Sequence, residues 1–148
     1  MIREFEETDI EVILDIWLHA SIVAHDFIDA DYWYSKRDDM RNVYFPSATT
    51  YVYENSGRVS GFISMVENYI AAIFVLPESQ GKGIGKQLID FVKSQYGKLE
   101  LSVYKENEAS VAFYKKQGFR IAYEGFDKQT KHVELIMRFE DSFGSIII

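Results

Sequence analysis

The sequence predicts one domain of mixed α/β architecture, and three observations indicate it. The chain has 148 residues, a length typical of a single domain with one substantial hydrophobic core. Hydrophobic residues make up 47% of the chain and charged residues 26%, a balance typical of folded proteins. Segments with the apolar spacing of helices alternate with segments typical of strands, and no repeat, low-complexity stretch or linker separates them. We therefore expect residues 1–148 to form a single domain.

The first half of the chain predicts a short strand, two helices and then three strands. Apolar residues recur every three and four positions over residues 9–20, and Thr8 and Glu11 have the spacing of a capping box, which indicates a helix. A second helix is expected over residues 31–44, ended by Pro46. Turn sequences separate three expected antiparallel strands, over residues 50–54, 59–67 and 69–76. The third has an unbroken apolar run, so we expect it at the centre of the sheet, buried on both faces.

The second half of the chain predicts two helices and three strands. A glycine-bearing segment leads into a helix expected over residues 83–96, whose apolar residues form one stripe. A strand is expected over residues 99–103. Asn107 and Gly118 are residue types typical of the start and the end of a helix, so we expect a helix between them. Two further strands complete the sheet, over residues 120–126 and 132–139.

The composition excludes several classes of function. The chain has no cysteine, which excludes disulfide bonds, a thiolate zinc site and a cysteine nucleophile. Its three histidines are too few and too scattered to indicate a metal site. The net charge of -7 disfavours nucleic acid as a partner, because phosphate binding needs a concentrated basic surface. No apolar run approaches the roughly 20 residues that span a membrane, and the first residues are charged, so we expect a cytoplasmic protein without a membrane partner.

Residues 80–86, with the sequence QGKGIGK, give the clearest sign of chemistry. They lie between an expected strand and an expected helix, where unpaired main-chain N–H groups and the helix dipole attract an anion. Two common nucleotide motifs do not fit. The phosphate loop of nucleotide hydrolases fails at Gln80 and Gln87, and the dinucleotide fingerprint fails because Lys86 stands where a third glycine is needed. A phosphate-binding loop and a purely structural turn both remain open.

Two motifs in the chain resemble those of a known family. Gln80, Gly83 and Gly85 have the spacing of the acetyl-CoA signature of the GNAT superfamily of N-acetyltransferases. A second block is similar to the cofactor-binding block of that superfamily, with Asn107, Phe113, Tyr114, Gly118 and Phe119. The resemblance covers residues 1–139 and is greatest to small bacterial single-domain members, while the tail at residues 140–148 has no counterpart. It implies a mostly antiparallel central sheet of about six or seven strands flanked by about four helices.

The resemblance also implies acetyl-CoA as co-substrate, without a metal. The backbone of Ile73, Phe74 and Val75 would pair with the pantetheine arm, while Asn107 reaches its amides and Tyr114 faces the sulfur. The loop that begins at Gln80 would hold the pyrophosphate through its main-chain N–H groups, with charge added by two lysines. Its residues are Gly81, Lys82, Gly83, Ile84, Gly85 and Lys86.

Acetyl transfer to an amine sets further requirements. A lysine-like amine is mostly protonated at pH 7, so a base or a water chain must remove its proton. Developing negative charge needs an N–H donor, which the resemblance places in the main chain near Phe74. Tyr114 can protonate the departing sulfur, or it can be a core tyrosine. Glu67 and His25 are the candidate bases. Alternatively, Glu67 is only a hydrophilic hairpin residue, and His25 is a loop histidine bonded to a neighbouring aspartate (Asp26 or Asp29).

The acidic residues are concentrated at the start of the chain. Residues 1–54 contain 12 Asp and Glu against 4 Lys and Arg, whereas residues 55–98 contain 3 against 5. These acids are either ordinary solvated helix faces or, because this third borders the acceptor side in the GNAT fold, a field that attracts a cationic acceptor. The acceptor would then be a small polyamine-like molecule or a lysine or N-terminus of a protein. Tyr104, and at least one of the three aromatic residues 32–34, are expected to line its cleft.

The function expected is direct acetyl transfer from acetyl-CoA to a primary amine. A non-catalytic acyl-CoA-binding module and a nucleotide-binding module that uses the same loop are the alternatives. Three isoleucines at residues 146–148 are poorly suited to water, so we expect them to pack either on the body of the domain or on a second subunit in a homodimer.

Overall fold

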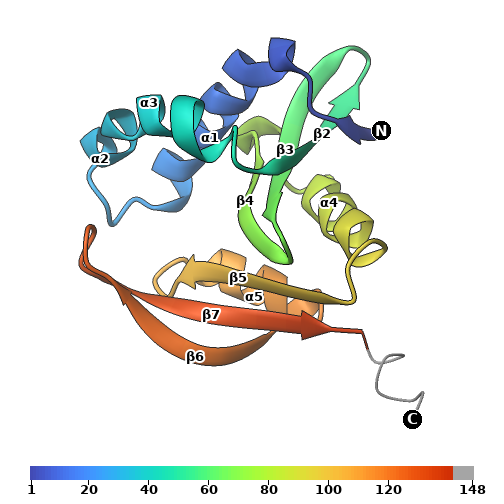
Figure 1. Cartoon of the computed structure of the whole chain (residues 1–148). Helices are drawn as coiled ribbons and strands as arrows, with labels where there is room; N and C mark the ends of the chain where they lie inside the picture. Colours follow the sequence, from blue (N-terminus) through green and yellow to red (C-terminus); the bar gives the residue numbers. More distant parts are fainter. Residues whose placement is uncertain (142–148) are drawn as a thin grey trace.

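A seven-stranded sheet forms the centre of the molecule, in the order β1-β2-β3-β4-β5-β7-β6 (Figure 1). The computed structural model describes residues 1–141, so the expected dimer contact at residues 146–148 lies outside the described part. Neighbouring strands are antiparallel except β4 and β5, which are parallel. The predicted, mostly antiparallel sheet is therefore confirmed. The strands are β1 (Ile2–Glu4), β2 (Thr49–Asn55), β3 (Arg58–Val66), β4 (Tyr69–Val75), β5 (Lys98–Tyr104), β6 (Arg120–Asp127) and β7 (His132–Glu140).

Helices cover both faces of this sheet. The segments α1, α2 and α3 lie together on one side of β3 and β4, and α4 lies on the other (Figure 1). Within residues 1–141 no helix is both long enough and apolar enough to span a membrane. The helices are α1 (Ile10–Ala24), α2 (Ala30–Ser35), α3 (Arg37–Asp39), α4 (Ile84–Lys93) and α5 (Glu108–Lys116), with short turns η1 (Glu7–Asp9), η2 (Met40–Tyr44) and η3 (Pro77–Ser79).

The helix expected over residues 31–44 is interrupted. Asp29 starts α2 by accepting a hydrogen bond from the N–H of Asp31 (2.9 Å), and α2 ends at Ser35. The chain continues through the single turn α3 into η2, a π-helical turn that ends before Phe45. Phe45 is buried against Phe62 with ring centroids 5.5 Å apart, so tertiary packing sets the path of this segment.

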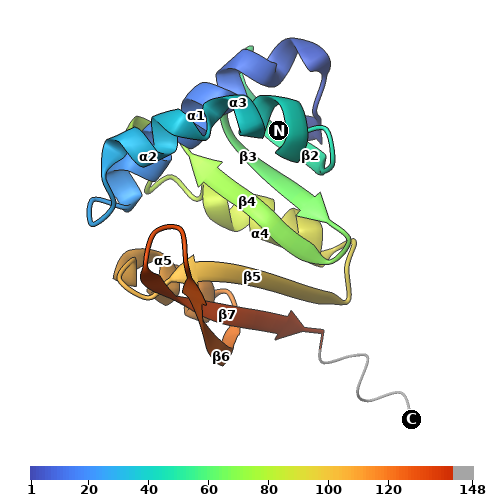
Figure 2. The ribbon, with the colours of Figure 1, turned by 60° about the vertical axis from the view of Figure 1, so that its left-hand side comes forward.

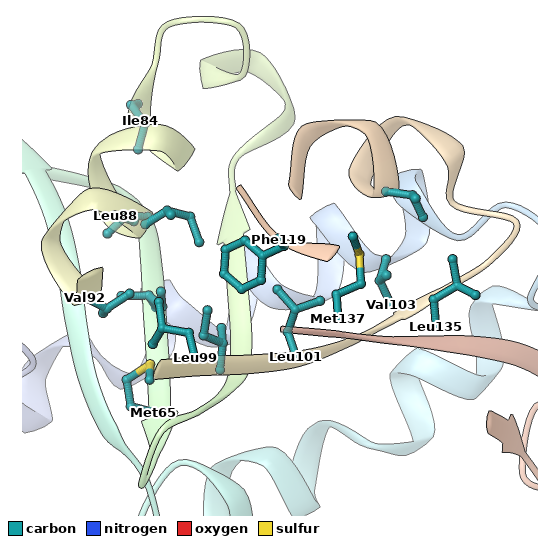
Figure 3. Close-up of a cluster of buried hydrophobic side chains, with 14 residues drawn as sticks. Met65, Ile84, Leu88, Val92, Leu99, Leu101, Val103, Phe119, Leu135 and Met137 are labelled. Carbon is teal, nitrogen blue, oxygen red and sulfur yellow. The ribbon is translucent and has the colours of Figure 1, made fainter. Parts of the chain in front are cut away.

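Two hydrophobic clusters lie on opposite faces of the sheet. One lies under α1, α2 and η2, where Trp17, Trp33 and Phe62 are the largest side chains. The other lies under α4 and α5, where Leu88, Leu99 and Met137 are fully buried (Figure 3). Together the two clusters hold α1 on one side of β4 and α4 on the other, and this arrangement positions the site.

As expected, β4 lies at the centre of the sheet, but the most buried strand is its neighbour β3. Every residue from Val59 to Met65 is buried, and the polar Ser64 bonds the hydroxyl of Thr50 (2.7 Å). The expectation that the strand over residues 69–76 is buried on both faces is wrong, because Ala71 is exposed and residues 73–75 are only partly buried. An apolar run shows that a strand can be buried. Whether its residues are buried depends on the strands and helices that pack against it.

The reason β4 remains uncovered is its short pairing with β5. The two parallel strands share one register pair, Tyr69 with Glu100, and the N–H of Glu100 also donates to the carbonyl of Asn68 (3.0 Å). Beyond this point the strands diverge, as Figure 2 shows. The β5-facing edge of residues 70–75 is therefore left without a partner strand.

Candidate active site

A cavity of about 820 Å³ opens where β4 and β5 diverge. Its walls come from β4, the loop at residues 79–86, the end of β5, α5 and the inner face of α1. Eleven of the residues predicted for the cofactor line this cavity: Ile73, Phe74, Val75, Gln80, Gly81, Gly83, Ile84, Gly85, Lys86, Asn107 and Tyr114. Lys82 instead lines a separate cavity of about 230 Å³ beside Arg58.

The loop that follows β4 has the geometry of an anion site. Gly81 and Gly83 have φ angles of +79° and +80°, a left-handed conformation that other residues rarely adopt. Gly83 is the N-cap of α4, so the N–H groups of the first helical turn have no partner within the helix. Gln80 fixes the loop to the sheet by donating its side-chain amide to the carbonyl of Val75 (3.1 Å). These N–H groups, at a helix N-terminus beside the cavity, suit an anion such as a phosphate group.

Helices α4 and α5 approach each other closely beside this loop. A Cβ atom built at Gly85 would lie 3.3 Å from Cζ of Phe113, so a larger residue would require Phe113 to shift. Phe113 in turn packs against Tyr114, with ring centroids 5.4 Å apart. Gly85, in the first turn of α4, thus lets the Tyr114 side of α5 approach the loop.

Tyr114 has a hydroxyl that is free to meet a bound group. The side chain lines the cavity, and within residues 1–141 its hydroxyl makes no hydrogen bond. Burial raises the pKa of Tyr114, so the hydroxyl keeps its proton at neutral pH. It can therefore donate a hydrogen bond or a proton to an anionic leaving group.

Asn107 combines a structural contact with a place in the cavity wall. It is the N-cap of α5, as predicted, and its Oδ1 accepts a hydrogen bond from the N–H of Ser110 (3.3 Å). The carbonyl oxygen is thus used by the helix, which leaves the side-chain NH2 as the group that can donate to a ligand.

His25 lies in the opposite wall of the cavity, directly after α1. Its ring stacks on Trp33 at 4.9 Å and meets Tyr104 edge-on at 5.2 Å. It is 7% exposed, and neither Asp26 nor Asp29 bonds it; Nδ1 has no hydrogen-bond partner in the described part of the chain. Burial lowers the pKa of His25 to about 4, so the ring is neutral at pH 7 and a poor base.

Glu67 is placed away from these residues. It lies in the turn between β3 and β4 with a φ angle of +54°, is exposed, and does not line the cavity. The loop at residues 80–86 follows the other end of β4, and a strand of seven residues is roughly 20 Å long. The structure therefore does not bring Glu67 to Tyr114.

Three polar cavity residues that the sequence did not nominate come from the strands. Tyr69, Ser102 and Glu134 line the cavity, and the hydroxyl of Tyr69 donates to Oγ of Ser102 (2.9 Å). Their alternation within apolar strands was visible in the sequence, but which face meets the cavity depends on how β5 pairs with β7. Tyr104 and Trp33 line the cavity, in agreement with the expectation for the acceptor side.

The family of the chain follows from comparison with known proteins. A family model described as an acetyltransferase (GNAT) domain matches residues 46–121, which contain β4, the loop and α5. The chain is also 36% identical over 138 residues to the peptidyl-lysine N-acetyltransferase YiaC of Escherichia coli, covering 93% of this chain and 94% of YiaC. This chain belongs to the GNAT acetyltransferases. It is an acetyl-CoA-dependent N-acetyltransferase.

Other GNAT proteins agree in sequence and in fold. The peptidyl-lysine N-acetyltransferase YjaB of Escherichia coli is 30% identical over 121 residues, covering 81% of this chain and 82% of YjaB. The solution structure of apo YjaB superposes with a TM-score of 0.85 at 27% identity, over 96% of this chain and 98% of that one. The PaiA N-acetyltransferase of Thermoplasma acidophilum, solved in complex with coenzyme A, shares the fold with a TM-score of 0.78, over 95% of this chain and 98% of that one, at 18% identity.

Proposed function

We propose that this GNAT enzyme acetylates the ε-amino group of a lysine side chain in a protein or peptide, by direct transfer from acetyl-CoA. The observation that carries the proposal is the single cavity that joins the anion loop to Tyr114 and continues to the wall formed by His25 and Glu134. One continuous space of this kind can hold both reactants together. The names of YiaC and YjaB support a lysine rather than a small polyamine as the acceptor.

Main-chain groups supply most of the contacts that bind acetyl-CoA. The N–H groups of residues 81–86 hold the diphosphate, and Lys86 adds positive charge. Lys86 also pairs with Asp90 at 2.6 Å, which orients its side chain along α4. The free edge of residues 73–75 offers N–H and C=O groups to the amides of the pantetheine arm, as an added strand would. Asn107 donates to the same arm through its side-chain NH2.

Proton transfer is the part of the reaction assigned to Tyr114. Acetyl-CoA supplies the activated acetyl thioester, whose sulfur leaves as a thiolate unless it is protonated. The hydroxyl of Tyr114 holds the proton for that sulfur, since burial keeps it un-ionised and no described residue competes for its hydrogen bond. The neutral His25 leaves removal of the amine proton to water in the cavity.

The test is release of coenzyme A with the Tyr114→Phe variant. With a lysine peptide, kcat should fall roughly 100-fold or more, because general acid catalysis is lost, while the Kd of acetyl-CoA stays within about twofold. Tyr34→Phe changes an exposed tyrosine outside the cavity and should retain full activity.

Two results would contradict the proposal. If Tyr114→Phe turned over as fast as the wild type, the acid would be another group. If spermidine were acetylated and lysine peptides were not, the proposed acceptor class would be wrong. If the protein bound acetyl-CoA but released coenzyme A with no amine, it would be a non-catalytic acyl-CoA-binding module.

A further inference from the structure

The cavity has opposite charges at its two ends. Of the residues within 1–141 that line it, Lys86 is the only cation and Glu134 the only carboxylate. Lys86 belongs to the loop that binds the diphosphate. Glu134 belongs to β7, on the far side of β5 from β4. An anionic group at one end and a cationic group at the other therefore suit this cavity electrostatically.

The strand pairing points the carboxylate of Glu134 toward the acceptor side. Glu134 lies directly opposite Tyr104 in the antiparallel pair of β5 and β7. The adjacent residues Val103 and Leu135 are buried in the cluster under α4 and α5. Because side chains alternate along a strand, Tyr104 and Glu134 extend from the other face of the sheet, where His25 meets Tyr104.

Glu134 is free to bind, whereas the nearby Asp127 is engaged. Asp127 accepts hydrogen bonds from the hydroxyl of Tyr104 (2.7 Å) and from the N–H groups of Gln129 and Thr130. The carboxylate of Glu134 makes no hydrogen bond or ion pair with any residue of the described chain. It is partly buried, and this burial, together with the charge of Asp127, raises its pKa. A cation beside it would relieve both effects.

A second observation at the same end also indicates a polar ligand. Nδ1 of His25 and Nε1 of Trp33 are both buried without a hydrogen-bond partner in residues 1–141, and both rings line the cavity. Buried polar atoms are normally bonded, so such atoms in a cavity wall indicate that a polar ligand binds there. Nδ1 of His25 can accept a hydrogen bond from an ammonium group, whereas the N–H of Trp33 needs an acceptor such as a main-chain carbonyl of the acceptor peptide.

We infer that Glu134 is the specificity-determining residue of the acceptor site, where it binds the ammonium group of the incoming lysine and selects acceptors that carry a positive charge. This inference rests on the proposed function, since it assigns a residue to that acceptor. It concerns binding of the acceptor in its charged form, so it is expressed in KM for the acceptor and not in affinity for acetyl-CoA. The neutral His25 beside it does not repel the cation.

The experiment compares two acceptor peptides that differ only in charge. One contains lysine; the other contains the same side chain ending in an aminooxy group, which is neutral at pH 7.5. In the Glu134→Gln variant, KM for the lysine peptide should rise about tenfold or more, while KM for the aminooxy peptide and the Kd of acetyl-CoA stay within about threefold. Glu124→Gln is the matched control, because Glu124 is exposed on the neighbouring strand β6 and pairs with Lys105 outside the cavity.

Each outcome is decisive. An unchanged KM for the lysine peptide overturns the inference, and an equal rise for both peptides overturns it too, because a loss of shape and not of charge would then be responsible. Calorimetric titration of each peptide into the coenzyme A-loaded protein separates this inference from the proposed function. If the wild type binds the lysine peptide in a Glu134-dependent way but releases no coenzyme A from acetyl-CoA, transfer fails and the inference stands. If the lysine peptide is acetylated at the same rate and KM with and without Glu134, the proposed function stands and the inference about Glu134 fails.

Discussion

At the scale of single residues, His25 shows how burial changes a chemical role. Its sequence position suggested an imidazole that titrates in the useful range. The ring is instead enclosed by Trp33 and Tyr104, and this burial lowers its pKa to about 4. The residue is thus suited to lining an acceptor pocket without adding charge.

The same burial makes stability depend on pH. The folded pKa of His25, about 4, lies below the ordinary 6.5, so between these values the unfolded chain binds a proton that the folded chain does not. The free energy of unfolding therefore decreases as pH falls through this range, by roughly 2 kcal/mol at pH 5 from this group. Urea unfolding at pH 7 and pH 5 measures this decrease in the free energy of unfolding. The His25→Phe variant, which lacks the titrating ring, should show a smaller decrease than the wild type.

The control for this prediction is His19→Gln. His19 is exposed on α1, and the variant keeps the ring at position 25, so it should show the wild-type loss of stability. A His25→Phe protein that lost as much stability on acidification as the wild type would show that other groups are responsible.

At the scale of elements, the loop between β4 and α4 joins conformation to binding. Gly83→Ala forces a residue with a side chain into a φ of +80°, which costs about 1 kcal/mol and disturbs the N–H groups that start α4. We expect the Kd of acetyl-CoA, measured by calorimetry, to rise about tenfold or more. Gly57→Ala is the matched control, since Gly57 has a φ of +76° and no atom within 4 Å of an added Cβ, as at Gly83, but lies in the β2–β3 turn. An equal loss of affinity for acetyl-CoA in both variants would contradict the role of this loop in binding the diphosphate.

Elements were predicted well where their signals are local. The cap at Asn107 and the glycines of the loop each depend on a few adjacent residues, and the structure places a helix boundary at each of them. The expected capping box of Thr8 and Glu11 was wrong, because Asp9 is the N-cap of α1 and the capping box is formed by Glu6 and Asp9 in η1. The helix expected over residues 31–44 is present as helical turns that are interrupted at Lys36. The burial of β4 was wrong because it depends on where β5 stops pairing, which no local pattern records.

The site shows the same division between local and distant information. Tyr114 was expected at the site because its block resembles the second GNAT motif, and it lines the cavity. Glu134 was missed, since its orientation requires the register of β5 against β7, strands separated by α5 and β6. Glu67 was nominated from its nearness to β4 in sequence, but it lies at the wrong end of that strand.

At the scale of the whole molecule, the acidic N-terminal third can guide a cationic acceptor. Part of its charge is neutralised locally, as where Arg37 and Arg41 pair with Glu11. In contrast, Asp26 and Asp29 are exposed in the segment that joins α1 to α2, and Asp31 is exposed in the first turn of α2, close in sequence to the cavity residue His25. They extend the field of Glu134 toward solvent.

This field predicts a dependence on salt that follows the charge of the acceptor. Raising the ionic strength from about 0.02 M to about 0.5 M shortens the screening length severalfold, so kcat/KM for the lysine peptide should fall severalfold. The neutral aminooxy peptide serves as the control and should change little. Steady-state rates at several salt concentrations measure both, and parallel curves for the two peptides would argue against steering.

The early parting of β4 and β5 has a consequence for the protein's life in the cell. Only one residue pair joins β4 to β5, so few backbone hydrogen bonds connect the half-sheet β1–β4 to the half-sheet β5–β7–β6. A pantetheine arm bound between β4 and β5 would add contacts to both halves. Ligands that bind only the folded chain stabilise it, by an amount that rises with the logarithm of their concentration above Kd. We therefore expect the metabolic state to govern not just how fast this enzyme works but how long each copy survives heat and proteases.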